Sequence, residues 1–233
     1  MSLENVVLKK NEIAFKWFNN YAGVSLRTPT RNLVIDPVDV SAKAFSTLDA
    51  ILITHEQYDH LDGLLVRKIQ ELTDCQVLAD PTSTRKLEHS IPPEKLREMQ
   101  PGTETKIGDV TVRAEICNHQ LAKTPVTFLI TSEENVTVFH TADSLPFAEM
   151  KDVCEKHKPD LVFCTVGIAP GASPKAGAEI VKLVNPKVAA PYHSASKTDL
   201  IEFCRILKKE KLKTKSLIPE RGNAYIVGKE LRK

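Results

Sequence analysis

Short apolar runs, several of them alternating with polar residues, dominate the first half of the chain. They predict strands over 13–17, 24–26, 32–35, 50–54 and 76–79. Between the last two runs, apolar residues recur at helical spacing from Leu61 to Leu72, which predicts an amphipathic helix. This half is therefore expected to contain consecutive strands and one strand–helix–strand unit.

The second half alternates strands and helices more regularly. Residues 82–100 are polar, and Pro92-Pro93 within them predicts the start of a short helix. Strands are expected over 110–116, 126–130, 136–140, 160–166, 188–190, 216–218 and 224–227. Helices are expected from near Pro146, from Pro174 to about Val184 after the N-cap Ser173, and over 199–209 after Ser196.

The order of these elements decides between two architectures. A doubly wound sheet would place a helix after nearly every strand, whereas here many strands follow one another directly. We therefore expect a layered α/β fold in which two sheets pack together and the helices lie outside them. No stretch is low in complexity and no repeat of about 20–50 residues is visible. One domain over 1–233 is the expectation.

Composition and charge argue against some classes of protein. The 32 Lys and Arg against 30 Asp and Glu leave a net charge of +2, unlike the basic surplus of a nucleic-acid binder. The basic run 208–215 is interpreted as a solvated helix end. Residues 1–10 have no apolar leader, and no apolar run approaches the roughly 18 residues of a membrane span. Five scattered cysteines are typical of free thiols, so a cytoplasmic protein is expected.

The loop between the strand 50–54 and the helix that follows it concentrates residues that can bind a metal. His55, Asp59 and His60 all lie within positions 55–60. Proteins with α/β folds place ligands at the carboxyl end of a strand, where it leads into a helix. Imidazole and carboxylate groups together suit Zn, Fe or Mn.

Three isolated residues further along the chain repeat this placement. His119 follows the strand 110–116, Asp143 follows 136–140, and His193 follows 188–190. Each is a ligand-type side chain just past a strand, so we expect them to share one metal site with the loop 55–60.

Two neighbouring residues leave alternatives open. Asp36, at the end of the strand 32–35, could support a metal-bound His from outside the ligand set, or it could be a plain turn residue. Tyr58 lies between ligand-type residues and could contact a substrate, but an ordinary loop aromatic is the preferred interpretation.

At these residues the sequence resembles the metallo-β-lactamase superfamily, whose signature is H-x-H-x-D-H after a strand, then a distant His, a distant Asp and a final His. The flanking segments are similar to the branch that contains L-ascorbate-6-phosphate lactonase. The segments that carry the resemblance are 33–37, 49–55, 139–144, 160–162 and 187–193. The resemblance implies a four-layer αββα sandwich with two mixed sheets, and a site at one edge of the sheets.

The resemblance also implies a set of metal ligands. The first metal position would be formed by His55, Gln57 and His119, the second by Asp59, His60 and His193, with Asp143 bridging the two. Gln57 is a departure, because the family has its second His there and an amide oxygen is a weaker donor than imidazole. We expect the first position to be weak, to take another metal, or to be empty; whether Gln57 is a ligand stays open.

The implied activity is metal-dependent hydrolysis of a lactone, an ester or a phosphodiester. Asp59 and Asp143 would be catalytic, since they would orient the attacking water. The expected cofactor is one or two divalent ions, with zinc preferred and manganese as the alternative. The expected partner is a small-molecule substrate, with no nucleic acid and no membrane, and a homo-oligomer is left open. The competing hypothesis is a degenerate member that binds metal or a small ligand without turnover. A nuclease is disfavoured because the chain has no room for an added basic domain.

Overall fold

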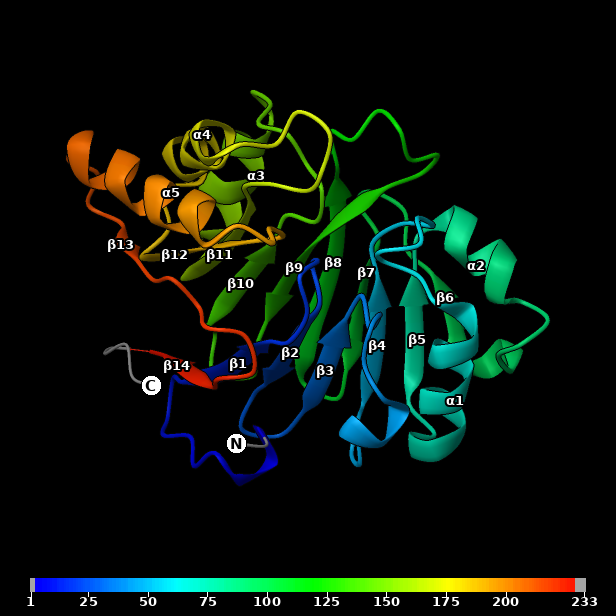
Figure 1. Cartoon of the computed structure of the whole chain (residues 1–233). Coiled ribbons are helices and arrows are strands. Elements are labelled where there is room, and N and C mark those ends of the chain that lie inside the picture. Colours follow the sequence, from blue (N-terminus) through cyan, green and yellow to red (C-terminus); the bar gives the residue numbers. More distant parts are fainter. Residues whose placement is uncertain (1–2, 229–233) are drawn as a thin grey trace.

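The computed structural model describes residues 3–228 and contains two seven-stranded sheets packed face to face (Figure 1). The first sheet has the order β14 (Tyr225–Val227), β1 (Ile13–Trp17), β2 (Val24–Arg27), β3 (Asn32–Ile35), β4 (Ala50–Ile53), β5 (Gln76–Ala79) and β6 (Leu96–Glu98). The second has the order β13 (Lys215–Ser216), β12 (Val188–Tyr192), β11 (Leu161–Thr165), β10 (Thr137–His140), β9 (Val126–Thr131), β8 (Val110–Ile116) and β7 (Glu104–Ile107). Both sheets are mixed, because β3 to β6 and β10 to β13 pair in parallel while the remaining neighbours are antiparallel.

Helices cover the outer face of each sheet (Figure 1). The first sheet carries α1 (Gly63–Thr73) and α2 (Pro81–Leu87), and the second carries α3 (Met150–His157), α4 (Pro174–Val184) and α5 (Lys197–Lys209). Three short 3₁₀ helices, η1 (Leu3–Asn5), η2 (Ala42–Ala44) and η3 (Pro93–Lys95), lie in connections. This is the predicted αββα sandwich with two mixed sheets.

The core explains why β4 is apolar at every position. Leu52 on this strand packs between the two sheets, whereas Ile51 and Ile53 pack beneath α1 in a second cluster. Between the sheets, Phe15 of β1 meets Phe163 of β11 edge to face, with ring centroids 5.0 Å apart. The strand that leads into the ligand loop is thus held by apolar contacts on both faces.

Helix caps fix where two of the predicted helices begin. Asp62 accepts a hydrogen bond from the backbone N–H of Leu65, so α1 begins at Gly63, two residues later than Leu61. Ser173 accepts one from Ala176, as predicted for α4. Ser196 precedes α5, but its side chain makes no capping bond.

The polar segment 82–100 is more regular than predicted. It contains most of α2 as well as η3 and β6, and β7 follows shortly after it. Thr82 and Ser83 are buried in α2, and such small polar residues give no apolar periodicity to detect. Within residues 3–228, the structure contains no helix with the length and apolar character of a membrane span.

Candidate metal centre

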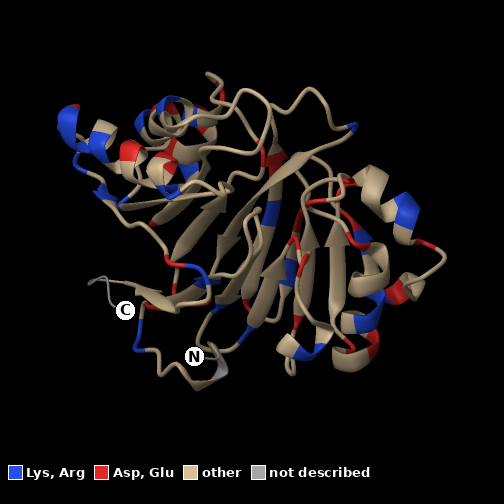
Figure 2. Cartoon of the chain, viewed as in Figure 1, with Lys and Arg blue, Asp and Glu red and all other residues tan. Residues whose placement is uncertain are grey.

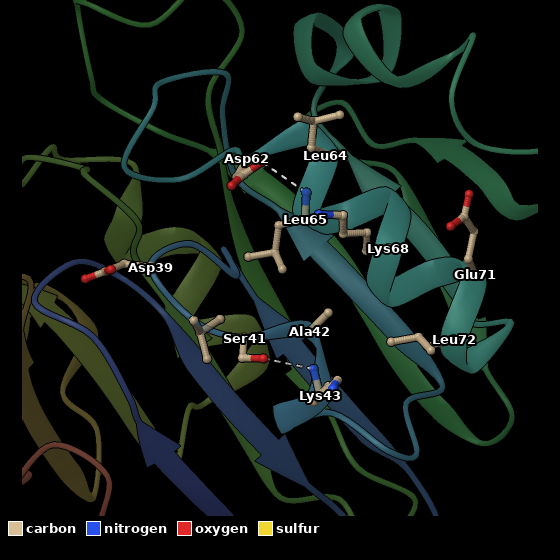
Figure 3. Close-up of a pocket in the computed structure, with 11 residues that line it drawn as sticks. Asp39, Ser41, Ala42, Lys43, Asp62, Leu64, Leu65, Lys68, Glu71 and Leu72 are labelled. Carbon is tan, nitrogen blue, oxygen red and sulfur yellow. Dashed lines mark hydrogen bonds between the residues drawn. The ribbon is translucent and has the colours of Figure 1, made fainter.

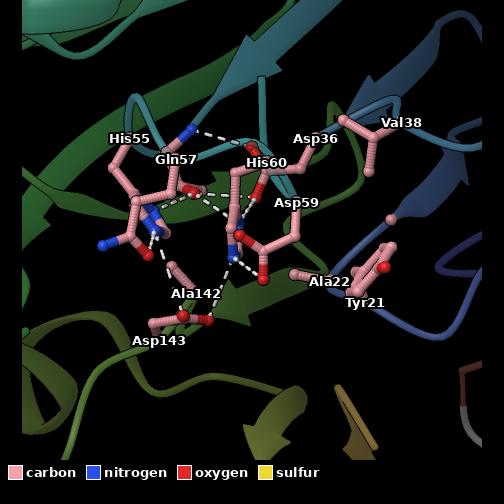
Figure 4. Close-up of polar contacts among 12 residues, drawn as sticks. Tyr21, Ala22, Asp36, Val38, His55, Gln57, Asp59, His60, Ala142 and Asp143 are labelled. Atoms are coloured by element: carbon pink, nitrogen blue, oxygen red, sulfur yellow. Dashed lines mark hydrogen bonds and ion pairs between the residues drawn. The ribbon is translucent and has the colours of Figure 1, made fainter. Parts of the chain in front are cut away.

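All seven residues of the predicted ligand set lie together at one edge of the two sheets. Figure 4 shows five of them, His55, Gln57, Asp59, His60 and Asp143. The loop after β4 supplies His55, Gln57, Asp59 and His60, and the loops after β8, β10 and β12 supply His119, Asp143 and His193. Six are buried and Gln57 is half-buried. Two sharp backbone turns position Asp143 and His193, because Ala142 and His193 adopt positive φ angles of 49° and 53°.

One group of ligand atoms comes from Asp59, His60, Asp143 and His193. Asp143 Oδ1 lies 2.7 Å from His193 Nδ1 and 3.2 Å from His60 Nε2. Asp59 Oδ2 lies 3.4 Å from His193 Nε2 and 3.8 Å from His60 Nε2. We call this group of two carboxylates and two imidazoles the Asp59 group.

A second group comes from His55, His119 and Asp143, with Gln57 beside them. Gln57 Oε1 lies 3.4 Å from His55 Nε2 and 3.2 Å from His119 Nε2. Asp143 Oδ2 lies 3.9 Å from His55 Nε2. We call these four residues the Gln57 group. Asp143 therefore turns one carboxylate oxygen toward each group.

Asp36 supports both groups from outside, which answers the alternative left open by its sequence position. Its Oδ1 accepts from the Thr54 backbone N–H at 2.8 Å, and its Oδ2 accepts from the Thr54 hydroxyl at 2.7 Å. Oδ2 also lies 2.7 Å from His60 Nδ1. Since an ionised carboxylate only accepts, the proton of His60 is assigned to Nδ1, and its Nε2 lone pair faces the Asp59 group.

Thr54 fixes the proton of His55 in the same way. Its single hydroxyl hydrogen goes to Asp36, so it can only accept from His55 Nδ1, which is 3.0 Å away. Burial lowers the pKa of His55 to about 3, so the ring carries one proton at pH 7. That proton belongs on Nδ1, and the Nε2 lone pair points into the Gln57 group. Neither the hydroxyl nor the residue Thr54 was singled out from the sequence.

The electrostatics of the Asp59 group favour positive charge. Although burial opposes it, the carboxylates of Asp143 and Asp36 raise the pKa of His60 well above 6.5. Burial also opposes charge on Asp143, yet His60 and His193 hold its pKa well below 3.8. In place of protonated imidazoles, a bound metal ion would supply the positive charge that these carboxylates favour, and the imidazoles would then be neutral.

Unpaired atoms test whether these residues fit a metal ion. Among the described residues, the buried side-chain atoms without a hydrogen-bond partner include His60 Nε2, Asp143 Oδ1 and His193 Nε2, all in the Asp59 group. A buried polar atom without a hydrogen bond is unfavourable, and these three are only partly compensated by ion pairs at 2.7–3.4 Å, which favours a ligand at this point. The residues fit a divalent cation by donor type, by charge and by these unpaired atoms.

The surroundings of the site include Tyr21, a residue that no sequence pattern pointed to. Tyr21, on the loop between β1 and β2, places its ring edge to face with His193 at 6.1 Å and with Tyr58 at 6.4 Å. Tyr58 is 80% exposed, which suits either a rim residue or an ordinary loop aromatic. Glu56 accepts from the backbone N–H of Lys123 and so ties the His119 loop to the ligand loop.

A separate open pocket of about 960 Å³ lies between η2 and α1 (Figure 3). Its lining includes Asp39, Lys43, Asp62, Lys68 and Leu72, and none of the seven predicted ligands. Asp62 there is occupied as the cap of α1. The pocket is therefore a neighbour of the metal-ligand cluster and not part of it.

Comparison with known proteins agrees with this geometry. The model of a beta-lactamase superfamily domain matches residues 18–194. The chain belongs to this superfamily. It is also 31% identical over 186 residues to the UPF0173 protein of Pyrococcus furiosus, covering 77% of this chain and 84% of that protein, which places it in the UPF0173 family.

Other relatives in the superfamily carry names that describe an activity. A UPF0173 metal-dependent hydrolase of Sulfurisphaera tokodaii is 27% identical over 218 residues, which cover 88% of this chain and 96% of that protein. The predicted enzyme class is thereby confirmed at the level of the family. A metallo hydrolase of Ignicoccus hospitalis, at 17% identity, superposes with a TM-score of 0.80 over 94% of this chain and 100% of that one, which confirms the fold.

Proposed function

We propose that this chain is a metal-dependent hydrolase whose reaction takes place at the Asp59 and Gln57 groups. The observation that carries the proposal is the convergence of three buried atoms that make no regular hydrogen bond, His60 Nε2, Asp143 Oδ1 and His193 Nε2, although ion-pair partners lie 2.7–3.4 Å from them. Such atoms are rare in buried sites, and three of them within one group of carboxylates and imidazoles favour a bound cation. The UPF0173 relatives named as metal-dependent hydrolases support the same reaction class.

The proposed ligands are His55, Gln57, Asp59, His60, His119, Asp143 and His193, and the proposed cofactor is zinc or manganese. A bound divalent ion supplies a nucleophilic water at neutral pH and polarises the scissile group. The chain's own part is to fix the donor atoms. Asp36 and Thr54 set the tautomers of His60 and His55, so that both Nε2 lone pairs face the cluster.

Asp59 and Asp143 are the proposed catalytic residues. Both are buried carboxylates, with relative exposures of 6% and 1%, and the pKa of each is lower than usual despite burial because His193 or His60 faces it. Each is therefore ionised at neutral pH and can accept a hydrogen bond from an attacking water. Both face the same ring atom, His60 Nε2, at 3.8 Å for Asp59 and 3.2 Å for Asp143, so together they can orient that water toward a bound substrate.

The proposed substrate is a small molecule with a lactone, ester or phosphodiester bond, as in the lactonase-like branch that the sequence resembles. Lys and Arg are interspersed with Asp and Glu over much of the view in Figure 2. The basic run 208–215 lies at the end of α5, away from the ligand loop, so nucleic acid is not part of the proposal (Figures 1 and 2). A cytoplasmic location is included because all five cysteines are free thiols. No membrane partner is included, and assembly into a homo-oligomer remains a prediction.

The test is a hydrolysis screen of the full chain loaded with Zn²⁺ or Mn²⁺. Lactones, carboxylic esters and phosphodiesters are assayed with the unmodified chain, with Asp59→Asn, and with Asp109→Asn as an exposed control. We expect hydrolysis in one substrate class that Asp59→Asn abolishes and Asp109→Asn leaves unchanged. Equal turnover by Asp59→Asn would contradict the proposal. Ion binding without turnover of any class would favour the non-catalytic alternative.

A further inference from the structure

The side-chain amide of Gln57 points into the metal-ligand cluster and contacts two imidazoles. Its Oε1 lies 3.4 Å from His55 Nε2, the neighbour labelled in Figure 4, and 3.2 Å from His119 Nε2 on a different loop. The side chain is only half-buried, so solvent was available to it. Instead, Gln57 Oε1 lies close to the Nε2 atoms of both His55 and His119.

The proton on His55 makes this contact informative. His55 Nδ1–H donates to Thr54, so in the neutral form of the ring, the form that binds a metal, the lone pair is on Nε2. Gln57 Oε1 and His55 Nε2 are then two acceptors facing each other, which repel unless something positive lies between them. His119 can donate to Oε1 from Nε2, but it cannot relieve the contact between Oε1 and His55.

A cation satisfies all of these atoms at once. It would take the lone pairs of His55 Nε2, His119 Nε2 and Gln57 Oε1, together with Asp143 Oδ2, which turns to this side of the cluster. The other way to satisfy the contacts is to turn the amide over, so that its NH₂ donates to both imidazoles and fills the space. The two arrangements predict opposite effects on ion affinity when the amide is removed: a loss if Oε1 binds the ion, and no loss or a gain if the NH₂ group fills the space.

We propose that Gln57 Oε1 is a protein ligand of a second ion position, formed with His55, His119 and Asp143, that is weaker than the position in the Asp59 group. This inference rests on the proposed metal-dependent function and deepens it. The Asp59 group has two carboxylates, whereas the Gln57 group shares only Asp143 and replaces a nitrogen donor by a neutral amide oxygen. Carbonyl oxygen suits Mn²⁺ better than imidazole does, so the Gln57 position also favours Mn²⁺ relative to an all-imidazole position.

The experiment counts ions and leaves activity aside. The full chain is stripped with a chelator, and Zn²⁺ or Mn²⁺ is titrated by calorimetry into the unmodified chain, Gln57→Leu and Gln57→His. The unmodified chain is expected to bind one ion tightly and a second more weakly. Losing an outer-shell partner already costs about 10–100-fold in metal affinity, so Gln57→Leu should weaken the second step by at least about 100-fold and leave the first unchanged.

Gln57→His gives the complementary result, because it restores an imidazole at the same place. It should tighten the second Zn²⁺ step and reduce the preference of that step for Mn²⁺. Gln100→Leu, at an exposed glutamine beyond β6, is the control and should match the unmodified chain.

Other results overturn the inference in distinguishable ways. A second step that is unchanged or tighter in Gln57→Leu would show that the amide fills the position and does not bind the ion. Two equal steps in the unmodified chain would contradict the difference between the positions. No ion bound by any variant would overturn the proposed function itself.

Discussion

The two halves of the metal-ligand cluster share one carboxylate and differ in nearly everything else. In the Asp59 group, carboxylates raise the pKa of His60 and His193 in spite of burial, and three buried atoms make no regular hydrogen bond. In the Gln57 group, burial lowers the pKa of His55 and His119, and a neutral amide faces both rings. One half is built to receive positive charge, while the other depends on Asp143 alone for its negative charge.

This difference shows how a single substitution can alter a two-part site without dismantling it. Asp143 gives Oδ1 to one half and Oδ2 to the other, and Asp36 with Thr54 orients a ring in each. The framework is thus common to both halves. What distinguishes them is the donor at position 57 and the second carboxylate, Asp59.

Removing the shared carboxylate should have the largest effect. Asp143→Asn takes an anionic oxygen from both halves, so we expect neither ion to be retained and hydrolysis to fall by more than the roughly 10–100-fold of an outer-shell change. Elemental analysis after dialysis and the kcat/KM of the loaded chain measure the two effects. Asp109→Asn is the matched control. Retention of one ion by Asp143→Asn would show that one half does not need this carboxylate.

Two His variants should separate the halves. His193→Ala removes a ligand of the Asp59 group and should abolish the tight step, whereas His119→Ala should remove only the weak step and leave one tightly bound ion. Calorimetric titration with Zn²⁺ measures both, and His89→Ala, at a side chain that is 89% exposed, is the control. Identical titration curves for the first two variants would contradict the division into halves.

A smaller effect is expected from outside the ligand set. Asp36→Asn keeps the shape but weakens the acceptor of His60 Nδ1–H and of Thr54, so metal affinity should fall by about 10–100-fold. Competition with a chromophoric chelator gives the affinity, and circular dichroism of the metal-free chain shows whether the fold is kept. An unchanged affinity in a folded variant would show that Asp36 does not orient these ligands.

The smallest effect is expected at the rim. Tyr58→Ala removes an exposed ring whose one described aromatic neighbour is Tyr21, a contact worth about 0.5–1.5 kcal/mol. The KM should rise by no more than about tenfold, with kcat and ion content unchanged. Steady-state kinetics on the substrate class found in the screen measures this. A fall in kcat would instead place Tyr58 within the reacting cluster.

Much of the fold could be predicted from local pattern. The uniformly apolar run of β4 indicated burial on both faces, and Ser173 marked the start of α4, because both signals lie in adjacent residues. The helix α2 and the short strands β6 and β7 were not predicted. Thr82 and Ser83 are buried in α2 by tertiary packing, and β7 shows only Thr105 and Ile107 on its buried side.

In the candidate site too, some features could be predicted from local sequence, and others depend on tertiary contacts. Ligand-type residues just past strands could be recognised singly, and parallel strand ends explain why they meet. The roles of Thr54 and Tyr21 depend on contacts that form only after folding, since Thr54 meets Asp36 through the pairing of β3 with β4. Asp143 faces one group with Oδ1 and the other with Oδ2. This depends on the direction of its side chain, which the spacing of residues along the sequence does not determine.

Calorimetric titration of the metal-free, unmodified chain with Zn²⁺ tests the central claim most directly, because the claim concerns two unequal ion positions in one cluster. We predict two steps, a tight one that saturates at one ion per chain and a weaker one that saturates at a second. A single step at two equivalent ions would contradict the inequality of the halves. No binding would contradict the metal centre and the hydrolase with it.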